Sequence, residues 1–167
     1  YLNTEARKRE VYGTGVDGRF AVGDRILGAI GQGEYRFSPL QLCVYASTLA
    51  NQGVRYKATF MNRVVSSDYR KLLLENKTQL LSHMEISDEA FEAYTTGMHL
   101  VTTGQFGTAK STFANYPIAV AGKTGTAEIG RGETRRKNTW IIAFAPYDNP
   151  VVALAMLVER GESGGKT

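Results

Sequence analysis

The sequence predicts an α+β fold, in which helices pack against an antiparallel sheet that has three C-terminal strands. Two segments carry signals for both the start and the end of a helix, and three apolar runs separated by turn residues follow them. The 167 residues are enough for one domain with its own hydrophobic core.

The first predicted helix begins at Ser38 and ends near Gly53. Ser38 is a favoured N-cap residue, and Pro39 fits the first turn. Gln41 can return a hydrogen bond to Ser38 as part of a capping box, and Gly53 can adopt the left-handed conformation that ends many helices. Cys43, the only cysteine, lies in this helix between apolar neighbours, which predicts a buried thiol rather than a nucleophile.

The second predicted helix runs from Ser87 to Gly104. Two acidic residues follow Ser87, as is favourable in a first turn, and Gly104 is a stop signal. Apolar side chains recur at helical spacing, at Phe91, Tyr94, Met98 and Val101. His99 in this helix and His83 before it have no partner at metal-ligand spacing. We therefore expect packing or surface roles for both histidines, and no metal site.

Residues 1–37 are predicted to be mostly loop, because glycines at 13, 15, 18, 23, 28, 31 and 33 interrupt any periodic pattern. Residues 13–18 match a dinucleotide-binding fingerprint by their letters. No apolar strand precedes this match and no clear helix follows it, so we interpret it as a turn-rich loop.

Strands are predicted in two regions. Residues 60–65 and 71–75 form a short pair around a polar turn at Ser66, Ser67 and Asp68. The C-terminal region is predicted to form three strands, separated by turn residues at 131–133 and 147–150. These three strands are expected at Ile118–Ile129, Thr139–Pro146 and Val151–Val158.

Charge and hydropathy exclude several classes of protein. The net charge of +4 comes from 20 basic and 16 acidic residues, without an aromatic-interleaved basic stripe, so nucleic-acid binding is not expected. The longest apolar run, Val151–Val158, is too short to cross a bilayer. Tyr1 to Glu10 is too polar for a signal peptide, although the chain could be a piece of a longer, exported protein.

One segment carries a chemical motif. Ala121–Glu128 contains Lys123-Thr124-Gly125, followed by Thr126, inside a predicted strand. A lysine at a strand edge supplies positive charge, and threonine hydroxyls can donate hydrogen bonds. A glycine lets a ligand backbone approach and add as an extra strand. The alternative is purely structural, since lysine and threonine are common on solvated strand edges and glycine can mark a bulge.

With its flanking segments, this motif resembles the C-terminal part of the transpeptidase domain of class B penicillin-binding proteins. The resemblance covers roughly residues 30–165 in the family's order, and its supporting segments are Gly31–Gly33 with Ser38–Leu42, Ala46–Gly53, and Trp140–Pro146. It implies a fold like that of penicillin-binding proteins and serine β-lactamases, with a five-stranded sheet that is incomplete here. Residues 1–167 would then be the C-terminal part of a single transpeptidase domain.

The resemblance also implies a substrate and roles for the motif. The substrates would be stem peptides that end in D-Ala-D-Ala, or the β-lactam antibiotics that mimic them, and peptidoglycan would be cross-linked through an acyl-serine intermediate. The residues expected to bind the substrate are Lys123, Thr124, Gly125 and Thr126. Lys123 would also act in catalysis, and the backbone N–H of Thr126 would form half of the oxyanion hole. No cofactor is expected.

The sequence lacks the nucleophile that this reaction needs. In the family, a Ser-x-x-Lys element lies upstream of the motif, whereas the match here, Ser163–Lys166, follows the last predicted strand and has no helix to position it. The family's Ser-x-Asn element has no match at all. We therefore expect the chain to lack the upstream nucleophile region and the final helix, and to be inactive alone.

Two alternatives stay open at this point. A β-lactamase or β-lactam sensor of the same superfamily would need a deacylating water or a signalling partner, and a non-catalytic relative would bind a partner or a stem peptide without chemistry. The longer protein is expected to be anchored in the bacterial cytoplasmic membrane, with this domain on the outer face. The chain by itself is expected to self-associate through an unpaired strand edge or to be only marginally stable.

Overall fold

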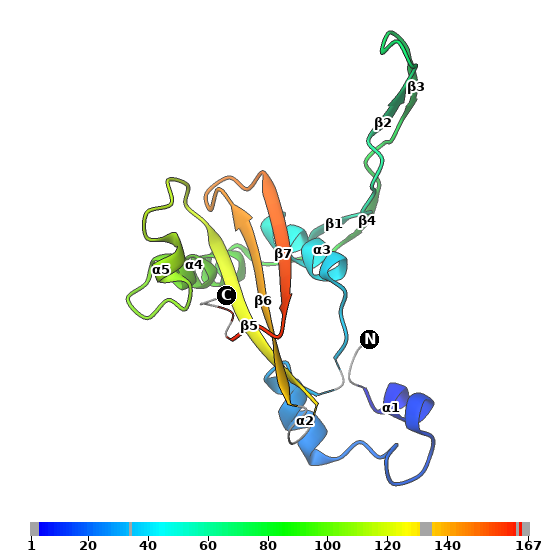
Figure 1. The fold of residues 1–167 in the computed structure, drawn as a ribbon, viewed down its shortest axis with the longest axis vertical. Helices are drawn as coiled ribbons and strands as arrows, with labels where there is room; N and C mark the ends of the chain where they lie inside the picture. Colours follow the sequence, from blue (N-terminus) through cyan, green and yellow to red (C-terminus); the bar gives the residue numbers. More distant parts are fainter. Residues whose placement is uncertain (1–3, 34, 131–134, 163, 165–167) are drawn as a thin grey trace.

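A three-stranded antiparallel sheet forms the centre of the structure (Figure 1). This computed structural model describes residues 4–33, 35–130, 135–162 and 164. The strands lie side by side in the order β5 (Ala121–Ile129), β6 (Arg136–Ala145) and β7 (Val152–Glu159). The predicted α+β class and the three C-terminal strands are confirmed, while the predicted turn at 131–133 lies outside the described residues.

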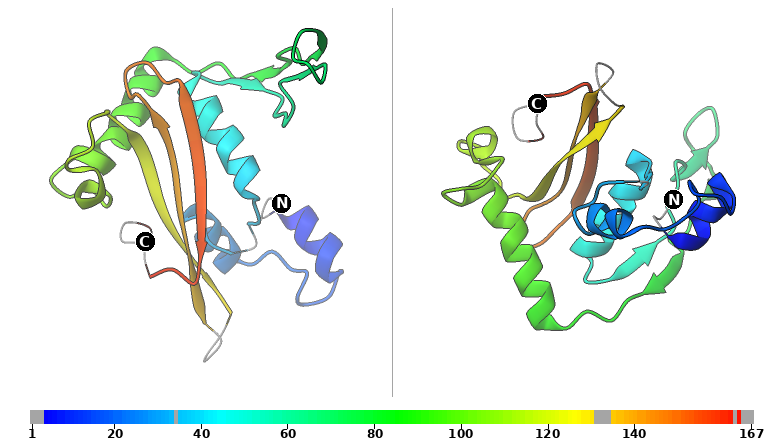
Figure 2. Two further views of the ribbon diagram at one scale, coloured as in Figure 1. Left: turned by 45° about the horizontal axis from the view of Figure 1, so that its top comes forward. Right: turned by 90° about the horizontal axis from the view of Figure 1, so that it is seen from below.

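Two helices cover one face of this sheet (Figure 2). α3 (Pro39–Ala50) packs on β6 and β7, and α4 (Asp88–Thr103) packs along β5. They meet the sheet in a small core that contains Met98, Ala121 and Phe144, of which Phe144 is only 1% exposed. In the part of the chain that the structure describes, no helix is long and apolar enough to cross a bilayer.

Both covering helices begin where the sequence predicts. Ser38 Oγ accepts a hydrogen bond from the N–H of Gln41 at 3.2 Å, and the Gln41 side chain accepts one from the N–H of Ser38 at 2.9 Å, which completes the capping box. Ser87 caps α4, because its side chain accepts from the N–H of Ala90 at 3.2 Å. Gly53 has a φ of 91°, the left-handed conformation expected after α3.

The opposite face of the sheet is partly open. Val152, Leu154 and Met156 of β7 lie on it and are 55%, 41% and 54% exposed. α5 (Lys110–Phe113), a short helix that the sequence analysis did not predict, lines an apolar pocket of about 390 Å³ together with these residues. Within the described part of the chain, β7 has no strand on its outer side.

A long two-stranded ribbon projects from the body of the domain between α3 and α4 (Figure 1). Four short strands build it as two antiparallel pairs: β1 (Val54–Tyr56) with β4 (Leu80–His83), and β2 (Arg63–Val65) with β3 (Leu72–Glu75). The predicted pair around the polar turn is confirmed in β2 and β3. β2 is shorter than predicted, because Phe60 lies outside the ladder and is 95% exposed. The pair formed by β1 and β4 was not predicted.

The prediction that residues 1–37 are mostly loop missed two helices that lie within them. α1 comprises Glu5–Tyr12 and α2 comprises Val22–Ala29. Three of the glycines fall between the helices at 13–18, where the predicted turn-rich loop is confirmed, and two more follow α2. Two others, Gly23 and Gly28, are accommodated inside α2. The number of glycines therefore led to a prediction of loop where two short helices form.

Local interactions explain why these two short helices form. Thr4 caps α1 by accepting a hydrogen bond from the N–H of Arg7 at 3.2 Å. The carboxylate of Asp24 accepts a hydrogen bond from the N–H of Ala21 at 2.7 Å, at the start of α2. Lys8 of α1 forms an ion pair with Asp24 at 2.8 Å, and the hydrogen bond from Lys8 lowers the pKa of the Asp24 carboxyl group. This pair joins the two helices across the glycine-rich loop.

The histidines have the packing and surface roles expected of them, whereas Cys43 is less buried than predicted. The Cys43 thiol is half-buried and donates to the carbonyl oxygen of Ala153 at 3.5 Å, which ties α3 to β7. The ring of His99 stacks on Tyr147, with centroids 4.3 Å apart. His83 lies exposed on the ribbon. His99 therefore has a packing role, and His83 is a surface residue.

We expect the isolated chain to self-associate through the open face and outer edge of β7. An apolar sheet face and an unpaired strand edge both promote contact with another chain. The double change Val152→Thr and Met156→Lys should shift the chain towards monomer, because it adds polarity and charge to this face. Light scattering over a concentration series measures the state. Val16→Thr with Tyr69→Lys is a matched control, since both side chains are exposed elsewhere.

A monomeric wild-type chain at every concentration tested would contradict this expectation. It would mean that the open face of β7 is covered in solution.

Candidate functional site

The predicted motif lies on a strand at the edge of the sheet. β5 pairs with β6 on one side, and the described residues contain no strand on its other side. Successive side chains of a strand point to opposite faces. Lys123 and Gly125 therefore share the helix-covered face with buried Ala121. Thr124 and Thr126 point to the opposite face, where α5 lies.

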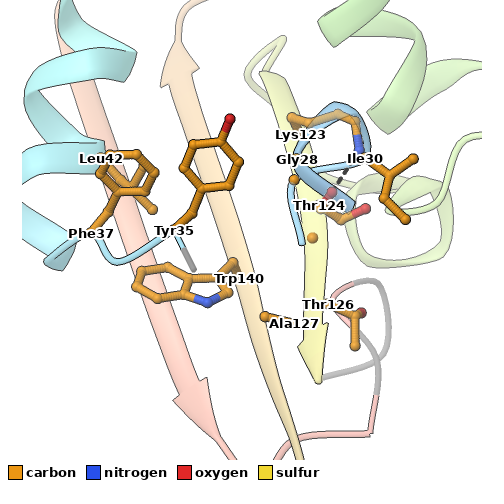
Figure 3. A pocket seen from close by; sticks show the side chains of 12 residues that line it. Gly28, Ile30, Tyr35, Phe37, Leu42, Lys123, Thr124, Thr126, Ala127 and Trp140 are labelled. Carbon is orange, nitrogen blue, oxygen red and sulfur yellow. Dashed lines mark hydrogen bonds between the residues drawn. The ribbon is translucent and has the colours of Figure 1, made fainter. Parts of the chain in front are cut away.

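A pocket of about 480 Å³ opens beside the motif (Figure 3). The four motif residues line one side, and mainly apolar residues line the rest, namely Gly28, Ile30, Gly31, Tyr35, Phe37, Leu42, Ala127 and Trp140. The structure thus brings the predicted residues together with an apolar wall that sequence reasoning missed. The segment before α3 was quoted for the family resemblance, and that was the available signal for part of this wall.

Two stacked aromatic rings form part of the apolar wall. Tyr35 and Phe37 have ring centroids 6.0 Å apart and planes inclined by 18°. They belong to the extended segment that leads into α3, and both line the same pocket as Trp140 of β6 (Figure 3). An apolar wall with few polar groups is typical of a small-molecule or peptide site, in which the polar groups set orientation.

Lys123 brings the positive charge of the site to this pocket. Its Nζ donates a hydrogen bond to the carbonyl oxygen of Thr124 at 2.6 Å. An ammonium group carries three N–H donors, more than this one bond uses. Lys123 can therefore donate a hydrogen bond to an anionic ligand group while it keeps its hydrogen bond to the carbonyl oxygen of Thr124.

Gly125 lies directly opposite Trp140 in the β5–β6 register. A Cβ built on Gly125 would meet the Cβ of Trp140 at 3.7 Å, an ordinary contact distance. The folded chain therefore has room for a side chain at position 125. That side chain would occupy the pocket, so internal packing does not require a glycine here.

Thr126 is held through both its carbonyl group and its hydroxyl group. Its carbonyl oxygen accepts a hydrogen bond from Nε2 of Gln32 at 3.1 Å, and its Oγ1 accepts one from the N–H of Gly164 at 3.3 Å. In an antiparallel strand, the N–H and C=O of one residue point to the same side. The N–H of Thr126 therefore faces the same side of β5 as the carbonyl that Gln32 contacts. Gln32 and Gly164 were not among the predicted site residues.

Thr124 has a structural contact of its own. It is 8% exposed, and its Oγ1 lies 2.6 Å from Oγ1 of Thr108 in the loop before α5. This hydrogen bond ties that loop to β5 on the face opposite Lys123. Substrate binding by Thr124 stays a prediction, with the added constraint that its hydroxyl already has a partner.

Comparisons with known proteins identify the family of this chain. The family described as "Penicillin binding protein transpeptidase domain" matches residues 14–167. The peptidoglycan D,D-transpeptidase MrdA of Haemophilus influenzae is 31% identical over 157 residues, which are 85% of this chain and 23% of that relative. The chain therefore belongs to the penicillin-binding protein transpeptidase family. It spans about a quarter of the length of this curated relative.

Solved structures show the same fold. Pseudomonas aeruginosa PBP2 in complex with WCK 5153 superposes with a TM-score of 0.74 at 27% identity, over 99% of this chain and 34% of that one. The imipenem acyl-enzyme complex of penicillin-binding protein A from M. tuberculosis gives a TM-score of 0.70 at 28% identity, over 87% of this chain and 31% of that one. Both relatives support the family's α+β fold for this chain.

We expect the Thr124–Thr108 hydrogen bond to contribute to stability. Thr124→Val keeps the shape of the buried side chain but removes its hydroxyl, and should lower the free energy of unfolding by about 0.5–1.5 kcal/mol. Thr108→Ala and the double variant complete a double-mutant cycle, which isolates the interaction between the two hydroxyls. Urea denaturation followed by circular dichroism provides the measurement. Strictly additive effects of the two changes would show that the hydroxyls do not interact.

Proposed function

We propose that this chain is the C-terminal part of a D,D-transpeptidase domain that cross-links peptidoglycan and binds β-lactams. The edge of β5 carries the proposal, because Lys123, Gly125 and Thr126 line a pocket of about 480 Å³ beside a strand edge that has no strand partner in the described chain. The names of the curated relatives support this reaction. The longer protein would be anchored in the cytoplasmic membrane with this domain on the outer face, where its substrate is found.

In this proposal the substrate lies along the open edge of β5 as an added strand. Its terminal carboxylate meets the positive charge of Lys123, and a threonine hydroxyl can donate to the same group. The bare backbone at Gly125 lets the peptide approach closely. The apolar wall of Tyr35, Phe37 and Trp140 excludes water from the other side of the pocket and strengthens these polar interactions.

The nucleophile would be a serine from a region of the longer protein upstream of this segment. Its hydroxyl oxygen attacks the carbonyl carbon of the penultimate D-alanine, and the N–H of Thr126 stabilises the negative charge that develops on the carbonyl oxygen. The amide bond then breaks, and the terminal D-alanine leaves with the serine proton on its amine. An amine of a second stem peptide attacks the acyl-serine, and its proton returns to the serine oxygen.

The chain alone is expected to form no covalent adduct with a penicillin, because it has no upstream Ser-x-x-Lys element. The test is incubation with a fluorescent penicillin, followed by a denaturing gel and intact mass. A stoichiometric adduct on Ser163 would overturn this reading of the C-terminal region, which lies partly outside the described residues.

In the longer protein, Gly125→Val is expected to nearly abolish acylation. The structure has room for the new Cβ, with Trp140 at 3.7 Å, so the protein should fold. The branched side chain would stand where the substrate strand lies, and this obstacle applies to every substrate. Second-order acylation rates on protein checked by circular dichroism provide the test. Acylation of Gly125→Val at the wild-type rate would show that the edge of β5 is not the substrate's binding site.

Thr126→Ala is expected to cause a smaller loss than Gly125→Val. The proposed oxyanion donor is a backbone N–H, which alanine retains, so the change removes only the hydroxyl, with its contact to the substrate and its hydrogen bond from the N–H of Gly164. That contact is worth about 0.5–1.5 kcal/mol if neutral and up to about 3 kcal/mol with a carboxylate. The acylation rate should therefore fall by a few-fold to about a hundredfold.

The β-lactamase alternative has a test of its own. Rapid turnover of a chromogenic cephalosporin by the wild type would favour that alternative.

A further inference from the structure

Two side chains of the protein already donate hydrogen bonds to carbonyl oxygens on the open edge of β5. Nζ of Lys123 donates to the carbonyl oxygen of Thr124 at 2.6 Å, and Nε2 of Gln32 donates to the carbonyl oxygen of Thr126 at 3.1 Å. Backbone groups two residues apart in a strand point to the same side. These two carbonyls are therefore successive acceptors on one edge, and they are the acceptors that an added substrate strand would meet.

A defined turn places Gln32 at this edge. The N–H of Gln32 donates to the carbonyl oxygen of Leu27 at 2.8 Å, and the N–H of Gly31 donates to that of Gly28 at 3.2 Å. Gly31 has a φ of 72°. This pair of bonds with a left-handed glycine is a Schellman motif, which ends α2. The backbone of Gln32 is thus fixed, and its side chain reaches a strand that lies 94 residues further along the chain.

We infer that Gln32 is a positioning residue, which holds the peptide group between Thr126 and Ala127 in the orientation that an incoming substrate strand requires. This inference rests on the function proposed above. A carbonyl oxygen has two lone pairs, so Thr126 can accept from Gln32 and from a substrate N–H at once. Gln32 therefore need not leave when the substrate binds.

The consequence of this contact falls on the transition state more than on initial binding. The N–H of Thr126, the proposed oxyanion donor, lies on the same side of the strand as the carbonyl that Gln32 holds. A preorganised donor stabilises developing charge without reorienting during the reaction. Loss of the contact should leave the substrate able to bind, but should let this part of β5 move away from the best geometry.

A purely structural tie between α2 and β5 is the competing explanation. In that case, removing the Gln32 donor would lower stability and leave the chemistry of the folded protein unchanged. Gln32→Met separates the two, because methionine keeps the length of the side chain and has no N–H donor. Gln79→Ala on the projecting ribbon is a matched control, since Gln79 is exposed and does not line the pocket.

The experiment uses the longer protein and a fluorescent penicillin in stopped flow, which separates the dissociation constant of the initial complex from the acylation rate constant. Gln32→Met should lower the acylation rate constant roughly three- to tenfold, while the dissociation constant changes less than about twofold. Hydrogen exchange should also be faster at the amide of Ala127, which shares its peptide group with the carbonyl of Thr126. Gln79→Ala should match the wild type in all three measurements.

An unchanged acylation rate constant in folded Gln32→Met, or a loss confined to the dissociation constant, would overturn the inference. The proposed function would survive either result, provided that the wild type acylates and Gly125→Val does not. Wild-type acylation by Gly125→Val would instead remove the proposed site, and the role of Gln32 with it.

Discussion

The pairing of β5 with β6 is the constraint on which the candidate site depends. The ladder runs without interruption from Ala121 opposite Phe144 to Ile129 opposite Arg136. One edge of β5 is thereby committed to the sheet, and the alternation of side chains is set along its whole length. Buried Ala121 shows which face meets the helices, and Lys123 and Gly125 follow on that face by parity alone.

An exposed strand edge is a liability in most proteins, because any extended chain can pair with it. Among the described residues, side chains rather than another strand limit this liability. Gln32 and Lys123 contact the carbonyls of this edge, and the segment that leads into α3 brings apolar residues alongside it. The edge of β5 is therefore accessible within a pocket of defined shape. Such a pocket favours pairing with an extended chain that fits it over pairing with any extended chain.

The sequence predicted those features whose causes are local. The capping box at Ser38 depends on residues within one turn, and Gly53 depends on its own φ. The three C-terminal strands were predicted because each apolar run and each turn can be recognised within a few residues. α1 and α2 were missed because their capping interactions were outweighed by the number of nearby glycines. The motif residues were found, but their partners were not.

Those partners could not be predicted because each contact depends on tertiary packing. Gln32 reaches Thr126, and Thr108 reaches Thr124, only after α2 and the loop before α5 have packed against the sheet. Tyr35 and Phe37 of the apolar wall likewise belong to an irregular segment, whose position no periodic pattern encodes. Family resemblance identified part of that segment without indicating which strand it would contact.

Two glycines near Thr126, Gly164 and Gly125, differ in what an added side chain would meet. A Cβ on Gly164 would lie 2.6 Å from the carbonyl oxygen of Gly125, a distance that the backbone cannot accommodate without moving. A Cβ on Gly125 would meet Trp140 at 3.7 Å and cause no clash inside the protein. Packing thus explains the glycine at 164 completely and leaves the glycine at 125 unexplained. The space that Gly125 leaves open is part of the pocket, and in the proposed function it is the space that the substrate strand would occupy.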